Sequence, residues 1–315
     1  MPRPKPTIGI TLGDPAGIGA EVVAKALNKP AIRNLAEFKL IGDMSVYRRY
    51  SKARIFPGCE FVDLKSLSAK SLRPGHPTAL SSAASLTYIE KAIALLKEKE
   101  ITALVTAPVY KEGITSLGKI FHGHTEFLAE AFGVHNFDMM FVTKTLKTVI
   151  VTRHLALKDV GQALSTGKIY QTIDLAHQAL RKYFKIQRPR IAVCGINPHA
   201  GEGGTIGQEE ITIISPAIEN AKAKGFRVAG PLAADTLFTP LVAKDYDVII
   251  AMYHDQGLIP VKTLYFRNVV NLTIGLPFIR TSPAHGTAFN IAGKNTADPS
   301  SMMEAIRLAA ALRCA

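Results

Sequence analysis

The chain has 315 residues, of which 47% are hydrophobic and 20% are charged. This composition excludes an intrinsically disordered protein, and the length suits two α/β domains or one large one. No apolar run reaches the ~20 residues of a membrane helix, and the N-terminal "MPRPKPTIGITLGDPAG" is too interrupted for a secretory signal. Three scattered cysteines, Cys59, Cys194 and Cys314, indicate reduced thiols in a cytoplasmic protein.

The chain is basic, with 38 Lys and Arg against 25 Asp and Glu, a net charge of 38 − 25 = +13. Such a charge could indicate a nucleic-acid partner. However, the basic residues are dispersed, as in "YRRYSKAR" and "LRKYFKIQRPR", and no aromatic–basic signature accompanies them. We therefore expect a solvated basic surface and no nucleic acid or membrane partner. The same field suits a small anionic substrate such as a phosphate ester.

Short apolar runs alternate with helical patterns along the chain. The predicted strands are 7–12, 38–42, 101–107, 147–152, 190–195 and 247–252. Their nearly continuous apolar character is typical of strands that are covered on both faces. The clearest helix, 81–100, carries the apolar stripe Leu86, Ile89, Ile93 and Leu96, with a serine expected at its N-cap. The alternation predicts a parallel or mixed sheet with helices on both faces.

Two motifs in the first half of the chain suggest ligand contacts. The first predicted strand ends in "TLGDPAGIGAE", where Gly13, Gly17 and Gly19 suggest a phosphate-binding turn. The motif is neither a dinucleotide fingerprint nor a Walker loop, and a tight structural turn explains it equally well. In "FHGHTEFLAE" (121–130), Thr125 is expected to cap the following helix and to leave His124 pointing into a cleft.

Three predicted strands are each followed within a few residues by a histidine. The stretches are "VIVTRHLAL", "AVCGINPHAGEGG" and "VIIAMYHDQGL", with His154, His199 and His254. If these strands are neighbours, all three imidazoles lie at one edge of the sheet, where ligands bind in such folds. Any one of them could be an ordinary loop histidine. Their common context favours a metal site, because neutral imidazole is the commonest metal ligand and three leave a position open.

The residues around the second and third histidines add further candidates. Gly201, Gly203 and Gly204 allow positive φ angles beside His199. In "GPLAADTLF", Asp235 is expected at a helix N-cap, a position that is usually structural. Further candidates, for binding an anion, are Lys262, Asn271 and Arg280, each of which could instead be a surface residue.

Seven motifs occur in a fixed order over most of the chain: "GDPAGIG", "GHTE", "NPHAGEGG", "ADTLF", "AMYHDQGL", "NLTIGLPFIRTS" and "HGTA". Together they resemble the 4-hydroxythreonine-4-phosphate dehydrogenase family of the vitamin B6 pathway. At 106–111 the chain has "TAPVYK" where that family usually has "TGPVHK". "HGTAFNIAGKNTADP" (285–299) is also similar to the loop that cradles the adenosine of NAD in isopropylmalate dehydrogenases, which would explain the absence of GxGxxG.

The resemblance implies a two-domain α/β/α fold like that of isocitrate and isopropylmalate dehydrogenases. Residues 1–130 with 265–315 would form a cofactor-side domain, and 131–264 a domain for metal, substrate and dimerisation. The implied activity is oxidation of the C3 hydroxyl of 4-phosphohydroxythreonine by NAD or NADP, followed by decarboxylation to 3-amino-2-oxopropyl phosphate. The implied protein is a cytoplasmic homodimer with the active site at the subunit interface and metal ligands from both subunits.

The resemblance also assigns roles to individual residues. A divalent zinc, magnesium or cobalt ion would be held by His154, His199 and His254. Two further roles follow from the chemistry and not from the resemblance: Asp235, or a neighbouring water, could accept the proton, and Asp255, which follows His254, could orient a neighbouring imidazole. The expected substrate contacts are His124, Thr125, Lys262, Asn271 and Arg280, and the expected cofactor contacts are His285, Gly286, Asn290 and Asp298.

Other functions remain open at the level of sequence. Paralogues oxidise D-threonate or D-erythronate 4-phosphate, and a more distant branch oxidises unphosphorylated diols such as terephthalate cis-diol. His124, Lys262 and Arg280 favour a phosphorylated substrate over such a diol. Clustered histidines in a basic protein would also suit a metal-dependent phosphohydrolase, and the net charge alone suggests a nucleic-acid binder. Neither of these last two explains the ordered motifs.

Overall fold

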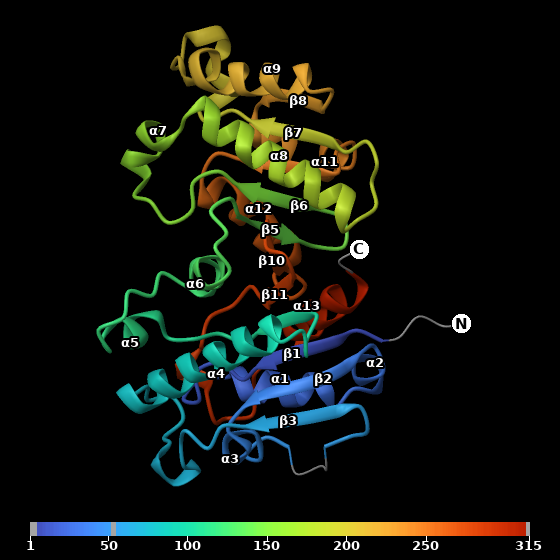
Figure 1. Cartoon of the computed structure of the whole chain (residues 1–315). Helices are drawn as coiled ribbons and strands as arrows, with labels where there is room; N and C mark the ends of the chain where they lie inside the picture. Colours follow the sequence, from blue (N-terminus) through green and yellow to red (C-terminus); the bar gives the residue numbers. More distant parts are fainter. Residues whose placement is uncertain (1–4, 52–54, 313–315) are drawn as a thin grey trace. The chain divides into compact units, whose positions relative to one another are not determined.

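The computed structural model describes residues 5–51 and 55–312, and the chain divides into two compact units (Figure 1). Unit 1 comprises the described parts of Met1–His135 and Leu276–Arg313, and unit 2 comprises Asn136–Gly275. Unit 1 therefore combines the two ends of the chain, and unit 2 is continuous.

Unit 1 contains a wholly parallel sheet with the strand order β3-β2-β1-β4-β11. The strands are β1 Thr7–Thr11, β2 Glu37–Gly42, β3 Cys59–Asp63, β4 Ala103–Thr106 and β11 Ile279–Pro283. Ile10, Leu40 and Leu104 are fully buried. Parallel strands of this kind require cover on both faces, which their apolar sequence indicates.

Helices lie on both faces of this sheet. They are α1 Gly19–Leu27, α2 Pro30–Arg33, α3 Met44–Tyr47, α4 Ala79–Lys97, α5 Lys111–Thr115, α6 His124–Ala131 and α13 Ser300–Ala311. Helix α4 packs on β1 and β2, and α13 packs on β4 and β11 together with α1 (Figure 1). The predicted stripe of α4, from Leu86 to Leu96, is buried. The predicted serine N-cap is wrong: Thr78 caps α4 and forms a capping box with Ser81.

Unit 2 contains a mixed sheet with the order β10-β5-β6-β9-β7-β8. The strands are β5 Asp138–Val142, β6 Lys147–Ile150, β7 Arg190–Cys194, β8 Arg227–Leu232, β9 Val248–Ala251 and β10 Val270–Ile274. Strand β5 is antiparallel to β6 and β10, and the remaining pairs are parallel. Strands β6, β9 and β7 are neighbours, so the three histidine-bearing segments follow adjacent parallel strands, as the sequence predicts.

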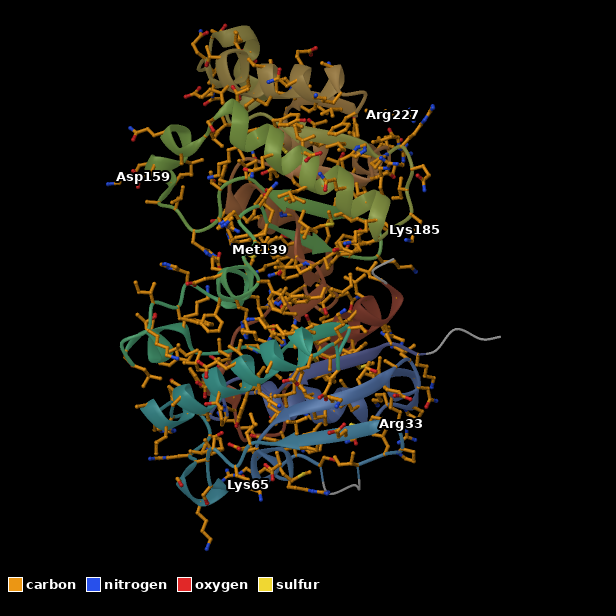
Figure 2. The ribbon with its side chains drawn as sticks, viewed as in Figure 1. Arg33, Lys65, Met139, Asp159, Lys185 and Arg227 are labelled. Atoms are coloured by element: carbon orange, nitrogen blue, oxygen red, sulfur yellow. The ribbon has the colours of Figure 1, made fainter. Side chains whose placement is uncertain are left out.

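Unit 2 contains both long and short α-helices. They are α7 Val160–Ala163, α8 Thr166–Lys182, α9 Ser215–Ala223, α10 Ala234–Leu237, α11 Pro240–Ala243 and α12 His254–Tyr265. Helices α8 and α12 both pack on β6 and β9, and Figure 1 shows them on opposite faces. Figure 2 shows side chains between the helices and the strands, and the labelled residues Asp159, Lys185 and Arg227 at the periphery, where they are exposed.

Two further predictions from the sequence concern the cysteines and membrane-spanning helices. Cys59 and Cys194 are free thiols, and Cys314 lies outside the described residues. Within 5–51 and 55–312, no helix combines the length and the apolar character needed to cross a membrane.

Candidate active site

Unit 1 buries an arginine at the end of its parallel sheet. Arg280, on β11, is 3% exposed. Its Nη2 donates to Oγ1 of Thr106 at 2.6 Å, and its Nη1 donates to Oγ1 of Thr125 at 3.2 Å. Thr106 is the last residue of β4, which pairs with β11, and Thr125 lies in the first turn of α6. The guanidinium is therefore oriented from two elements, and the surface alternative for Arg280 is wrong.

The surroundings of Arg280 are strongly basic. Burial lowers the pKa of Arg280 to about 10, and the Glu126 carboxylate opposes this shift. Burial, assisted by the charges of Arg280 and Lys111, holds the pKa of His124 well below its ordinary value near 6.5. The Nε2 atom of His124 is buried and has no hydrogen-bond partner among the described residues. A neutral imidazole beside two cations is a set of side chains suited to bind a phosphate or carboxylate, and we call it the Arg280 cluster.

The role of Thr125 differs from its prediction. The N-cap of α6 is Gly123, and no side chain caps this helix. The Thr125 hydroxyl instead accepts a hydrogen bond from an arginine 155 residues away in sequence. Thr106 and Lys111 also belong to the Arg280 cluster, since Thr106 accepts a hydrogen bond from Arg280 and the charge of Lys111 acts on His124. In the sequence, Thr106 and Lys111 are the first and last residues of the "TAPVYK" motif.

Two of the three candidate ligand histidines lie together in unit 2. The ring centroids of His154 and His254 are 5.7 Å apart. His254 begins α12 directly after β9, and its Nδ1 lies 2.7 Å from Oδ1 of Asp255. When Nδ1 donates this hydrogen bond, Nε2 carries the lone pair that a metal requires. Both histidines line a cavity of about 420 Å³.

His199 lies in a left-handed turn after β7. The turn runs from Pro198 to Gly204, and His199 itself has φ 52° and ψ 27°. In the part of one chain that the structure describes, no group of three or more His, Cys, Asp or Glu side chains is placed to hold a metal ion. The adjacent strands therefore bring the three segments to one edge of the sheet without assembling a three-histidine cluster in a single chain.

Asp235 lies close to the histidine pair. It is the second residue of α10, and its Oδ1 accepts a hydrogen bond from the Thr236 amide at 2.8 Å. The N-cap of α10 is Ala233, so the predicted capping role is wrong. Asp235 is exposed and lines a cavity of about 540 Å³. Tyr253 and Asp255 line both this cavity and that of His154 and His254, so Asp235 faces a space adjoining the histidines.

The two other substrate candidates of unit 2 differ in burial. Lys262 is partly exposed on α12. Asn271, on β10, donates from Nδ2 to the sulfur of Met139 at 3.4 Å, a weak hydrogen bond to a residue labelled in Figure 2. Its Oδ1 is buried and has no hydrogen-bond partner within the described ranges. A buried amide oxygen of this kind is available to a ligand donor.

The candidate cofactor residues lie in unit 1, on the loop between β11 and α13. His285 has Nδ1 3.0 Å from the Gly286 carbonyl oxygen, and burial lowers the pKa of His285. Asn290 and Asp298 are exposed, and Asp298 accepts hydrogen bonds from Ser300 at the start of α13.

This loop contacts the N-terminal glycine motif. The amide of Ile18 donates to the Thr287 carbonyl at 3.0 Å. A Cβ on Gly17 would lie 2.9 Å from the same oxygen, so only glycine permits this approach. The glycines of "GDPAGIG" thus serve at least one structural contact, with the loop that carries the candidate cofactor residues.

Comparisons with known proteins identify the family of the chain. The family described as "Pyridoxal phosphate biosynthetic protein PdxA" matches residues 18–309. A 4-hydroxythreonine-4-phosphate dehydrogenase from Desulforapulum autotrophicum is 41% identical, over 97% of this chain and 95% of the relative. A D-threonate 4-phosphate dehydrogenase from Cupriavidus necator is 42% identical, over 98% and 97%.

Solved structures show the same fold. The 4-hydroxythreonine-4-phosphate dehydrogenase of Klebsiella pneumoniae has a TM-score of 0.87 at 38% identity, covering 99% of both chains. A β-decarboxylating dehydrogenase from Thermococcus kodakarensis, 14% identical, has a TM-score of 0.52 over 96% of this chain and 81% of that one. This distant similarity confirms the predicted fold class of the decarboxylating dehydrogenases. The family match and the full-length relatives establish that the chain belongs to the PdxA family of dehydrogenases, the 4-hydroxythreonine-4-phosphate dehydrogenase enzyme family.

Proposed function

We propose that this protein is a cytoplasmic enzyme that oxidises 4-phosphohydroxythreonine at C3 in a reaction dependent on NAD or NADP and on a divalent metal. The resulting β-keto acid loses CO₂ to give 3-amino-2-oxopropyl phosphate, in the pathway to pyridoxal phosphate. The observation that carries the proposal is the pairing of His154 with His254, whose Nδ1 is engaged by Asp255, at the end of the parallel strands of unit 2.

The donor set fits a divalent zinc or cobalt ion, whereas magnesium, the third ion that the resemblance implies, prefers oxygen ligands and fits it less well. Imidazole nitrogen suits zinc and cobalt in particular, and the contact between Asp255 and His254 is the carboxylate–histidine arrangement that typically supports such ligands. We assign the ligand set to His154, His254 and His199. A bound ion would act as a Lewis acid that stabilises negative charge on the C3 oxygen by several kcal/mol.

The remaining residues bind and orient the reactants. The Arg280 cluster, with His124, Thr125 and Lys111, would bind an anionic group of the substrate, and its buried guanidinium is held in place before the substrate arrives. Lys262 and Asn271 would supply a further charge and a further hydrogen bond. Asp235, which faces the space beside the histidines, would accept the proton of the C3 hydroxyl. The loop containing His285, Gly286, Asn290 and Asp298 would bind the dinucleotide.

We further propose a homodimer with metal ligands contributed by both subunits. A second copy would complete the histidine pair, because the described residues of one chain gather His154 and His254 without a third ligand. Leu155 and Leu157, next to His154, are 48% and 71% exposed and line the same cavity. Exposed apolar side chains around a polar site are typical of a protein interface.

One alternative substrate is supported by a specific observation. The relative from Cupriavidus necator acts, by its name, on D-threonate 4-phosphate and is as similar to this chain as the 4-hydroxythreonine-4-phosphate dehydrogenases are. The two substrates differ in the amino or hydroxyl group beside the carboxylate. An enzyme for D-threonate or D-erythronate 4-phosphate would keep every role assigned above.

The test is a kinetic comparison of the three substrates. Purified protein with added Co²⁺, Zn²⁺ or Mg²⁺ is given 4-phosphohydroxythreonine, D-threonate 4-phosphate and D-erythronate 4-phosphate, and nicotinamide reduction is followed by absorbance. We expect the largest kcat/KM for 4-phosphohydroxythreonine. A larger value for either sugar acid would assign the protein to the alternative, and phosphate release without nicotinamide reduction would indicate a phosphohydrolase.

A further inference from the structure

The turn that carries His199 has an unfavourable backbone. His199, Ala200 and Glu202 have φ angles of 52°, 54° and 43°, and Gly201 and Gly203 between and beside them have 80° and 66°. Residues with a Cβ rarely adopt this left-handed region, and several in succession are rarer still. Such a conformation persists only where the surrounding structure imposes it. Some neighbouring group must therefore hold this turn.

That group is the carboxylate of Glu210. Glu210 begins the π-helical turn Glu210–Ile214 and is 3% exposed. Its Oε1 accepts hydrogen bonds from the amides of Ile196 and Asn197, at 2.8 and 2.7 Å. Its Oε2 accepts one from Nδ2 of Asn197 at 2.9 Å. One buried carboxylate thus fixes the backbone immediately before Pro198 and His199.

Two glycines allow the carboxylate to approach this closely. A Cβ on Gly201 would lie 2.7 Å from Oε2 of Glu210, and a Cβ on Gly195 would lie 2.9 Å from Oε1. A Cβ on Gly203, by contrast, would meet no atom within 4 Å. Gly201 and Gly203 therefore share a left-handed conformation, but only Gly201 contacts Glu210.

Gln256 anchors the start of the same turn. It lies in the first turn of α12, and its Nε2 donates to the carbonyl of Gly195 at 2.7 Å. Its Oε1 accepts from the amide of Met252 at 2.7 Å. This single side chain ties the end of β7 to the end of β9, so the segment before His199 is fixed to the segment before His254.

We infer that Glu210 is a positioning residue that holds the His199 turn in its ligand-presenting conformation, with Gln256 anchoring the base of that turn. The inference rests on the proposed function for the role of His199. The conformation of the turn follows from these hydrogen bonds and does not depend on the proposed function. A Glu210→Gln variant keeps the size of the side chain but replaces one acceptor oxygen with an NH₂ group. The remaining oxygen can keep the two backbone amides, so the new NH₂ group faces Nδ2 of Asn197, which is itself a donor. Turning the Asn197 amide would relieve this contact only by setting its Oδ1 against Oε2 of Glu209, to which Nδ2 donates at 2.7 Å in the wild type.

The experiment combines hydrogen exchange with metal affinity in the full-length protein. Amide exchange of segment 195–204 is measured by mass spectrometry, and Co²⁺ affinity by titration against a competing chelator. For Glu210→Gln we expect exchange of the segment to rise and Co²⁺ affinity to fall, each by about tenfold or more, as for other residues that orient metal ligands. Gln256→Glu keeps the acceptor for Met252 and loses the donor to Gly195, and should change both quantities in the same direction.

Two control variants separate positioning from general destabilisation. Glu219→Gln removes a carboxylate from the surface of α9, where the side chain is 67% exposed, and should leave exchange and affinity at wild-type values. Gly201→Ala and Gly203→Ala both place a Cβ on a residue with a positive φ angle, at a similar cost in free energy. Only the Cβ of Gly201→Ala would clash with Glu210. Co²⁺ affinity should therefore fall several-fold more in Gly201→Ala than in Gly203→Ala.

The outcomes distinguish this inference from the proposed function. If the wild type binds Co²⁺ and Glu210→Gln binds it equally well, the positioning role is wrong and the proposed function stands. Equal affinities for Gly201→Ala and Gly203→Ala would contradict it as well. If the wild type neither binds Co²⁺ nor reduces nicotinamide, the proposed function fails, and the exchange of 195–204 alone decides whether Glu210 holds the turn.

Discussion

At the scale of single residues, Arg280 combines a charged side chain with nearly complete burial. Its guanidinium is buried and is held by the hydroxyls of Thr106 and Thr125. A planar group with several N–H donors can keep both hydrogen bonds and still present donors to an anion, whereas the ammonium of lysine is a single point charge on a flexible stem. The identity of this residue should therefore matter more than its charge.

We expect Arg280→Lys to reduce kcat/KM for the phosphorylated substrate by about 10- to 100-fold, mainly through KM. A hydrogen bond to a charged group contributes about 1.5–3 kcal/mol, which corresponds to this range. The measurement is steady-state kinetics by nicotinamide absorbance. Arg307→Lys, on α13, is the matched control, since Arg307 pairs with Glu304 on the same helix and should tolerate lysine. A KM for Arg280→Lys within twofold of wild type would contradict the binding role.

Whether the sequence predicts the role of a residue depends on how far away in the chain the residues that it contacts lie. The three histidine segments could be recognised because the run of apolar residues before each of them is local. The hydroxyl of Thr125 could not be assigned, because its partner Arg280 is 155 residues away and the local pattern suggested a cap. The sequence does not predict the role of Glu210 either, because nothing near it distinguishes it from an ordinary helix residue. Its hydrogen bonds are to the amides of Ile196 and Asn197, earlier in the chain.

At the scale of elements, the strands that the sequence predicts are those with a nearly continuous apolar run. Strand β5 (Asp138–Val142) is buried at every position but is not among them, because its apolar run is short and begins after an aspartate. The six strands predicted from apolar runs all form, each with bounds within about two residues of the prediction. Strand β3 (Cys59–Asp63) is partly exposed throughout and β8 (Arg227–Leu232) contains glycine and proline, so neither gives a continuous apolar signal. Strands β10 (VNLTI) and β11 (IRTSP) also lack a continuous apolar signal, because polar residues interrupt both and β11 ends in proline.

Helix α8 carries a histidine whose ionisation opposes folding at acid pH. His177 is buried and stacks on Phe226 with ring centroids 3.9 Å apart. Burial, together with the charge of Arg181, lowers the pKa of His177 below its ordinary value near 6.5. As pH falls through about 6.5, the unfolded chain takes up a proton that the folded imidazole resists. Stability is therefore lost as pH falls below this value.

Replacing His177 with phenylalanine should remove this contribution and keep the stacked ring. We expect the melting temperature of His177→Phe, relative to wild type, to rise as pH is lowered from 7 to 5. Differential scanning calorimetry at several pH values measures the effect. His124 and His285 also have lowered pKa values and would preserve part of the acid sensitivity in the variant. Melting curves that shift in parallel across this pH range would contradict the assignment to His177.

At the scale of the whole molecule, the proposed sharing of ligands between subunits can be tested by complementation. If one site takes His154 and His254 from one chain and His199 from its partner, His199→Ala and His254→Ala homodimers are both inactive. A mixed dimer would then have one intact site and one lacking two ligands. With random exchange, half of the dimers are mixed, so about a quarter of wild-type activity should return. No recovery after demonstrated subunit exchange would place all three ligands in one subunit, and an active His199→Ala homodimer would remove His199 from the site.

The most direct test of the central claim is the stoichiometry of the reaction with 4-phosphohydroxythreonine, measured with and without a chelator. Nicotinamide reduction and CO₂ release are recorded together in the metal-replete enzyme. The proposed function predicts equimolar reduced nicotinamide and CO₂, loss of both products after chelation, and recovery of both on adding Co²⁺ or Zn²⁺. Full turnover in the chelated enzyme, or no nicotinamide reduction in the replete one, would contradict it.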